Sequence, residues 1–213
     1  MNGALNLLVG LAMGLNLLAL ASGRLPSIIR AAAVQGMILG VLPLLMEHAF
    51  DWLVILVAVG TIAVKGFVIP GLLRRAVRAA NIDREVEPLI GYIPSLLLGA
   101  GATIGAVALA DVLPLRPEHA GSLLVSGSFA TVVSGFLLLM GRAKAISQVC
   151  GYLILENGIY LFGLLLIKST PLIVEAGILL DLTVAVFVIG IIVDRIQREF
   201  DTLDTRKLNV LRE

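Results

Sequence analysis

Residues 146–167 read ISQVCGYLILENGIYLFGLLLI, an apolar run that carries one carboxylate, Glu156, near its middle. A hydrocarbon core of roughly 30 Å is crossed by about 20 mostly apolar residues in a helix. Similar runs occur elsewhere in the chain: Gly3–Ser22, Ile28–Met46, Trp52–Leu72, Tyr92–Ala110, Ala120–Met140 and Leu172–Val193. The sequence therefore predicts an all-α, polytopic integral membrane protein with about seven transmembrane helices.

The composition supports this fold class. Of 213 residues, 59% are hydrophobic and 15% are charged, and the mean hydropathy of +1.02 is far above that of a water-soluble domain. Cys150 is the single cysteine, which excludes an intramolecular disulfide. No metal-ligand spacing, nucleophile–base set or phosphate-binding loop is present, so we expect no metal, no nucleic-acid partner and no independent enzyme.

The basic residues between the runs indicate the orientation in the membrane. They follow the first, third, fifth and seventh runs, as at Arg24, Arg75, Arg142 and Arg195. Under the positive-inside rule this pattern places the N-terminus outside and the C-terminus in the cytoplasm. The first run is expected to be a retained helix, since no basic residue precedes Arg24. The third run is expected to continue as a helix through Ala80.

Small residues predict where helices pack closely. Gly101 and Gly105 form a GxxxG pattern in the fourth run, and Ser128, Thr131 and Gly135 follow one face of the fifth. Both runs are therefore expected to face other helices rather than lipid. The tail after residue 195 has an amphipathic pattern, which suits a membrane surface, a partner protein or a solvated helix end.

Charged residues inside the apolar runs are candidates for function, because a charge near the bilayer centre is costly unless it is paired, hydrated or neutralised. Glu156 lies about twelve residues, or roughly 18 Å of helix, beyond Lys144 and therefore near mid-depth. Asn157 adjoins it, while Tyr152 and Tyr160 share its helix face and are candidate hydrogen-bond donors.

Three further charges complete the predicted proton relay. Asp181 also falls near mid-depth, in the seventh run, and would exchange protons with Glu156. Lys65, in the third run, is either a cationic partner of the carboxylates or a side chain that reaches back to the cytoplasmic surface. Glu175 lies about one turn inside its helix and ranks below the others. For Glu156 and Asp181 the alternative is a structural hydrogen bond to another subunit, and for Glu175 it is a side chain that reaches the membrane interface.

The segment 151–163, GYLILENGIYLFG, closely resembles the signature of the membrane component E of hydrogenase-4, and EFDTLDT at 199–205 is similar to the tail of that family. The last three helices in turn resemble the K subunit of respiratory complex I, in which two buried glutamates belong to the proton path. Alignment places Glu156 about one helical turn after the first of these and Asp181 near the second. This resemblance implies N-terminal helices over 1–110, a K-subunit-like part over 111–195 and an amphipathic cytoplasmic tail over 196–213.

The resemblance implies a membrane-arm subunit of a group 4 NiFe-hydrogenase of the hydrogenase-4 or formate hydrogenlyase type, in a bacterial or archaeal cytoplasmic membrane. Its expected partners are antiporter-like membrane subunits and peripheral hydrogenase subunits. The nickel–iron centre and the iron–sulfur clusters would belong to those partners, with no cofactor in this chain. The alternatives are a non-conducting scaffold between these partners and, less favoured, a stand-alone small-solute transporter.

Overall fold

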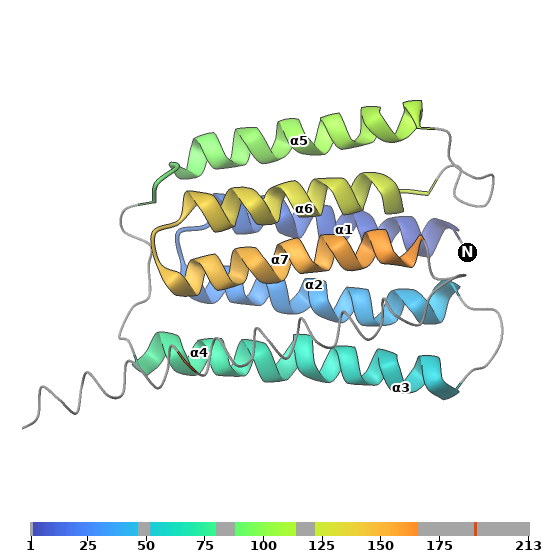
Figure 1. Cartoon of the computed structure of the whole chain (residues 1–213), viewed down its shortest axis with the longest axis horizontal. Coiled ribbons are helices and arrows are strands. Elements are labelled where there is room, and N and C mark those ends of the chain that lie inside the picture. Colours follow the sequence, from blue (N-terminus) through green and yellow to red (C-terminus); the bar gives the residue numbers. More distant parts are fainter. Residues whose placement is uncertain (1, 47–51, 80–87, 114–121, 166–189, 191–213) are drawn as a thin grey trace, which may run out of the picture.

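The computed structural model describes residues 2–46, 52–79, 88–113, 122–165 and 190, and its secondary structure is helical. The helices run side by side along one axis (Figure 1). In chain order they are α1 (Asn2–Ala21), α2 (Leu25–Met46), α3 (Trp52–Thr61), η1 (Ile62–Val68), α4 (Ile69–Ala79), α5 (Tyr92–Val112), α6 (Leu124–Gly141) and α7 (Ala145–Leu164). Their bounds agree with the predicted runs to within a few residues.

Five of the described helical stretches are long and apolar enough to cross a membrane, which makes the chain a multi-pass membrane protein. They are Gly3–Ala21, Leu25–Met46, Val54–Arg78, Tyr92–Val112 and Leu124–Gly141. The predicted sixth run forms α7, where Glu156 and Asn157 interrupt the apolar sequence. The predicted seventh run and the tail lie outside the described residues, apart from Gly190. Three points therefore stay predictions: the total of seven spans, the sides of the membrane on which the termini lie, and the division of the chain at residue 110.

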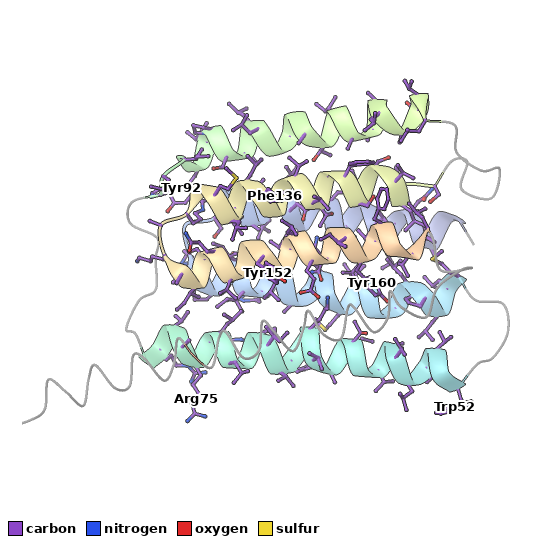
Figure 2. The ribbon with its side chains drawn as sticks, viewed as in Figure 1. Trp52, Arg75, Tyr92, Phe136, Tyr152 and Tyr160 are labelled. Atoms are coloured by element: carbon purple, nitrogen blue, oxygen red, sulfur yellow. The ribbon has the colours of Figure 1, made fainter. Side chains whose placement is uncertain are left out.

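The segments α3, η1 and α4 form one long helix, and its expected continuation beyond the membrane is confirmed as far as Ala79. Trp52 and Arg75 lie at its opposite ends (Figure 2). Its middle segment, η1, is a π-helix in which the Ile69 N–H donates to the Val64 carbonyl, five residues earlier. Such π-helical turns are rare and frequently occur at functional sites. In this chain the π-helix contains Lys65.

The core consists of two apolar clusters with a polar layer between them. One cluster includes Leu20, Ile28 and Ile154, and the other includes Val9, Leu39 and Leu161. On each of α1, α2, α6 and α7 the stretch between the two clusters carries buried polar residues, which include Asn16, Gln35, Thr131, Glu156 and Asn157. The polar side chains of different helices therefore meet at one level inside the bundle.

The predicted packing is confirmed for α6 and corrected for α5. Ser128, Thr131 and Gly135 on α6 are buried, as expected. Gly101 and Gly105 on α5 instead face open space, since no atom lies within 4 Å of a Cβ placed at either position. The helix α5 packs through Ser95, Gly99 and Ala106, on another face of the same helix. The GxxxG pattern therefore makes no close helix contact within the described part of this chain.

Candidate functional site

An ion pair between Lys65 and Glu156 lies in the polar layer of the bundle. Lys65 Nζ is 2.6 Å from Glu156 Oε1, and the two side chains are only 6% and 3% exposed. Removing both charges from water is costly, and the attraction between them offsets this cost only when the geometry is close and further hydrogen bonds are made. Such a pair is therefore weak as a source of stability and a strong candidate for function.

Lys65 reaches Glu156 because η1 packs closely against α2. A Cβ placed at Gly36 would lie 2.6 Å from Lys65 Cβ, so only glycine lets the lysine stem approach this closely. Gly40 on α2 similarly accommodates Ile62, and Gly66 on η1 accommodates Met37. These glycines hold the π-helix against α2 and direct Lys65 towards the interior instead of the membrane surface. Of the two predicted positions of Lys65, the structure shows the buried one.

Glu156 is positioned by close backbone packing between α6 and α7. A Cβ at Gly151 would lie 2.5 Å from Leu139 N, and a Cβ at Gly158 would lie 2.5 Å from Val132 N. A Cβ at Gly135, on α6, would clash with the backbone of Leu155 on α7. These glycines lie on both sides of Glu156 along the helix pair, and such spacing lets helix backbones approach closely. The carboxylate is therefore carried by a rigid pair of helices.

A chain of side-chain hydrogen bonds extends from Lys65 across the bundle. Lys65 Nζ donates to Asn157 Oδ1 over 3.3 Å, and Asn157 Nδ2 donates to Gln35 Oε1 over 3.2 Å. Gln35 Nε2 donates to Asn16 Oδ1 over 2.8 Å, and Asn16 Nδ2 donates to Thr131 Oγ1 over 2.9 Å. These residues come from η1, α7, α2, α1 and α6. Five helical segments thus contribute to one buried polar chain.

The two predicted supporting tyrosines occupy different surroundings. Both lie on α7 (Figure 2). Lys65 Nζ lies 5.7 Å from the centre of the Tyr160 ring, within the range of a cation–π interaction. Tyr152 is partly buried against the apolar cluster that includes Ile28 and Ile154. Tyr160 therefore lies beside Lys65, whereas Tyr152 packs against the neighbouring apolar cluster.

The structure brings together three of the predicted polar residues, Lys65, Glu156 and Asn157. The predicted carboxylates Asp181 and Glu175 lie outside the described residues. Asn16 and Gln35 were not predicted as site residues, although each is an isolated amide within a long apolar run, and that pattern is a usable signal. Within the described residues, no three His, Cys, Asp or Glu side chains gather where they could hold a metal ion.

Arg142 is a second buried charge that was predicted only as a loop cation. Its side chain is fully buried at the end of the bundle where α6 ends and α7 begins. Its guanidinium donates to the carbonyl oxygens of Leu20 over 2.6 Å and Ile90 over 3.2 Å, and it lies 4.6 Å from the centre of the Tyr92 ring. Because Arg142 joins α1, the start of α5 and the α6–α7 turn, its position indicates a structural role.

Comparison with known proteins gives relatives but no matching fold. No family model matches the chain, and no solved structure matches it. Hydrogenase-4 component E from Escherichia coli K12 and from Shigella flexneri is 27% identical over 136 residues, which is 63% of this chain and 63% of each relative. The expected resemblance to that component is thus confirmed as a distant similarity over less than two thirds of its length. The similarity to the K subunit of complex I stays a prediction.

A further relative covers more of the chain. The uncharacterized protein Rv0085 of Mycobacterium tuberculosis is 39% identical over 192 residues, which is 89% of this chain and 87% of the relative. Identity at this level over nearly the full length of both chains indicates common descent and a common fold. The chain therefore belongs to the same protein family as Rv0085.

Proposed function

We propose that this chain is a non-catalytic membrane subunit of a hydrogenase-like complex and that Lys65 and Glu156 carry protons within it. The observation that carries the proposal is the buried 2.6 Å ion pair between two helices at the middle of the bundle. The distant similarity to hydrogenase-4 component E supplies the class of complex. The hydrogen chemistry would take place in partner subunits, which would hold the nickel–iron centre and the iron–sulfur clusters.

The geometry of the pair suits proton transfer. A proton that moves from Lys65 Nζ to Glu156 Oε1 converts an ammonium and a carboxylate into a neutral amine and a carboxylic acid. Net charge is conserved in this step, so no isolated charge is left in the low-dielectric interior. The amine can then accept another proton, while the carboxylic acid can release its proton to the next group. The pair can therefore load and release protons in turn.

The next group in the relay is proposed from the sequence. Asp181 has the depth expected of an acceptor for the Glu156 proton, and Glu175 would lie further along the same helix, nearer to its outer end. Asn157 and Tyr160 would support the relay by interacting with the Lys65 ammonium, as they do in the described geometry. Tyr152, four residues before Glu156 on α7, is a further candidate support for the relay.

The second candidate function is a scaffold that holds antiporter-like subunits against the hydrogenase module. Its supporting observation is α5, on which Gly101, Gly105, Ile93, Leu97 and Ile104 are exposed along most of the helix. A scaffold requires partner contacts but no titratable pair. Neutralising Glu156 would then leave proton translocation unchanged, whereas bulky residues at Gly101 and Gly105 would release partners.

Membership in a complex is tested by mild-detergent purification of the tagged chain from native membranes, followed by mass spectrometry. The proposal predicts recovery of a NiFe-hydrogenase large subunit together with antiporter-like membrane proteins. Recovery of the chain without these partners would contradict it. Solute uptake by the purified chain in liposomes would then support the stand-alone transporter instead.

A further inference from the structure

The hydrogen-bond chain that leaves Lys65 has a single direction. In Asn157, Gln35 and Asn16 the carbonyl oxygen accepts from the side of Lys65, and the amide nitrogen donates towards Thr131. In all three amides the carbonyl oxygen therefore faces the neighbour on the Lys65 side of the chain, and the Asn157 oxygen contacts the ammonium group itself. Hydrogen bonds linked in this way strengthen one another in a low-dielectric interior.

The direction is fixed by groups that cannot exchange donor and acceptor roles. Lys65 in its ammonium form only donates, so the Asn157 oxygen must face it. At the other side, Gln35 Nε2 also donates to the backbone carbonyl of Ala12 over 3.4 Å, and a carbonyl only accepts. The Gln35 nitrogen must therefore face α1, and its oxygen must face Asn157. Turning any one amide around would place two donors or two acceptors in contact.

We propose that Gln35 is a positioning residue, which holds the Asn157 oxygen towards Lys65 and so keeps the Lys65 side chain in place against Glu156 between proton transfers. Asn16 and Thr131 extend this support to α1 and α6. The inference rests on the proposed proton relay and adds residues that do not contact Glu156. Gln35 is 1% exposed and both hydrogens of its amide are used, so its orientation is well determined.

The test compares variants of Gln35 in inverted membrane vesicles that hold the assembled complex, with proton uptake measured per hydrogen turned over. Gln35→Met keeps the length and nearly the volume of the side chain but removes its hydrogen-bonding groups. It is expected to lower uptake per turnover about ten-fold, because the Asn157 oxygen is then no longer held in its hydrogen bond to the charged Lys65. Gln35→Glu is expected to retain uptake as the neutral carboxylic acid, whose carbonyl oxygen accepts from Asn157 Nδ2 and whose O–H donates to Asn16 Oδ1. Equal losses in both variants, or no loss in Gln35→Met, would overturn the inference.

Two controls separate positioning from packing. Gln148→Met makes the same change at a glutamine on α7 that donates to the backbone carbonyl of Arg142, outside the hydrogen-bond chain, and uptake should remain normal. Asn157→Asp removes the Nδ2 donor, so the hydrogen bond to Gln35 is already lost, while either carboxylate oxygen still accepts from Lys65 Nζ. In that background Gln35→Met should cause no further loss of uptake. A further ten-fold loss there would assign Gln35 a packing role instead and contradict the inference.

Two reference variants make each outcome decisive. If Gln35→Met fails to assemble, Asn16→Leu breaks the chain one residue further from Lys65 and is expected to lower uptake about three-fold. Normal uptake in Asn16→Leu would then reject the inference. Glu156→Gln tests the proposed relay itself. Loss of uptake in Glu156→Gln with normal uptake in Gln35→Met would reject only the positioning role, whereas normal uptake in Glu156→Gln would reject the relay.

Discussion

Replacing Lys65 by Met should destabilise the bundle strongly, because it leaves a buried carboxylate without its cation. The Glu156 side chain is 3% exposed, and its pairing distance to Lys65 is 2.6 Å. Removing one member of a buried pair costs about 3 kcal/mol or more, whereas replacing both members by neutral residues costs much less. The change Lys65→Met is therefore expected to lower the free energy of unfolding by about 3 kcal/mol.

The two partners are expected to differ in how much they tolerate substitution. Glu156→Gln keeps an acceptor oxygen for Lys65, so its expected cost is about 1.5 kcal/mol. The double variant Lys65→Met/Glu156→Gln has no buried charge at this level and should cost about 2 kcal/mol, less than the two single changes together. This difference corresponds to a coupling energy of about 2.5 kcal/mol between the two side chains.

The assay is equilibrium unfolding of the purified chain in mixed micelles at increasing fractions of denaturing detergent, followed by helical circular dichroism. The four proteins of the cycle are measured under the same conditions. Additive costs, with a coupling energy below about 0.5 kcal/mol, would show that Lys65 and Glu156 do not interact in the folded protein. The buried pair, and the relay built on it, would then be refuted.

Three further predictions concern the packing and the orientation of the bundle. Gly135→Val should lower the free energy of unfolding by about 3 kcal/mol, because the valine side chain would meet the backbone of α7. Gly101→Val faces open space and should change the midpoint of detergent unfolding little. Arg142→Met should lower the free energy of unfolding by about 3 kcal/mol, because the carbonyl oxygens of Leu20 and Ile90 lose their donor. Arg75→Met, at an exposed position, should change it by less than about 0.5 kcal/mol, and melting curves of both variants measure the difference. The predicted orientation places Arg75 on the cytoplasmic side, so Arg75→Cys should react with a membrane-impermeant maleimide in inverted vesicles only, and Trp52→Cys in right-side-out vesicles only. The reverse labelling pattern would overturn this orientation.

The helices could be predicted from the sequence because each depends on a local property, a run of about 20 apolar residues. The position of Lys65 could not be predicted, because it depends on a tertiary contact. In the sequence a lysine at this depth can reach the membrane surface or turn inward, and the choice is made by Gly36 on another helix and by the π-helix around Lys65. Neither feature has a reliable signal in the apolar sequence.

The carboxylate site was predicted more completely than the amides around it. Glu156 and Asn157 are conspicuous in an apolar run, and the structure confirms that both are buried. Gln35 and Asn16 are uncharged and equally isolated, but their partners lie on other helices and emerge only when the bundle is assembled. The GxxxG pattern led to a wrong prediction of packing within the bundle, because spacing alone does not indicate whether Gly101 faces this chain or its surroundings.

If the buried pair carries protons, Glu156→Gln must abolish proton translocation by the assembled complex. The variant complex is compared with wild type and with Asp111→Asn, which makes the same chemical change at an exposed position near the end of α5. Inverted vesicles are supplied with the substrates for hydrogen turnover, and the pH gradient is recorded with a fluorescent dye at equal amounts of assembled complex. A proton path through Glu156 predicts no gradient at any residual hydrogen turnover in Glu156→Gln and a normal gradient in Asp111→Asn. A normal gradient in Glu156→Gln would rule out the relay and leave Glu156 with a structural role.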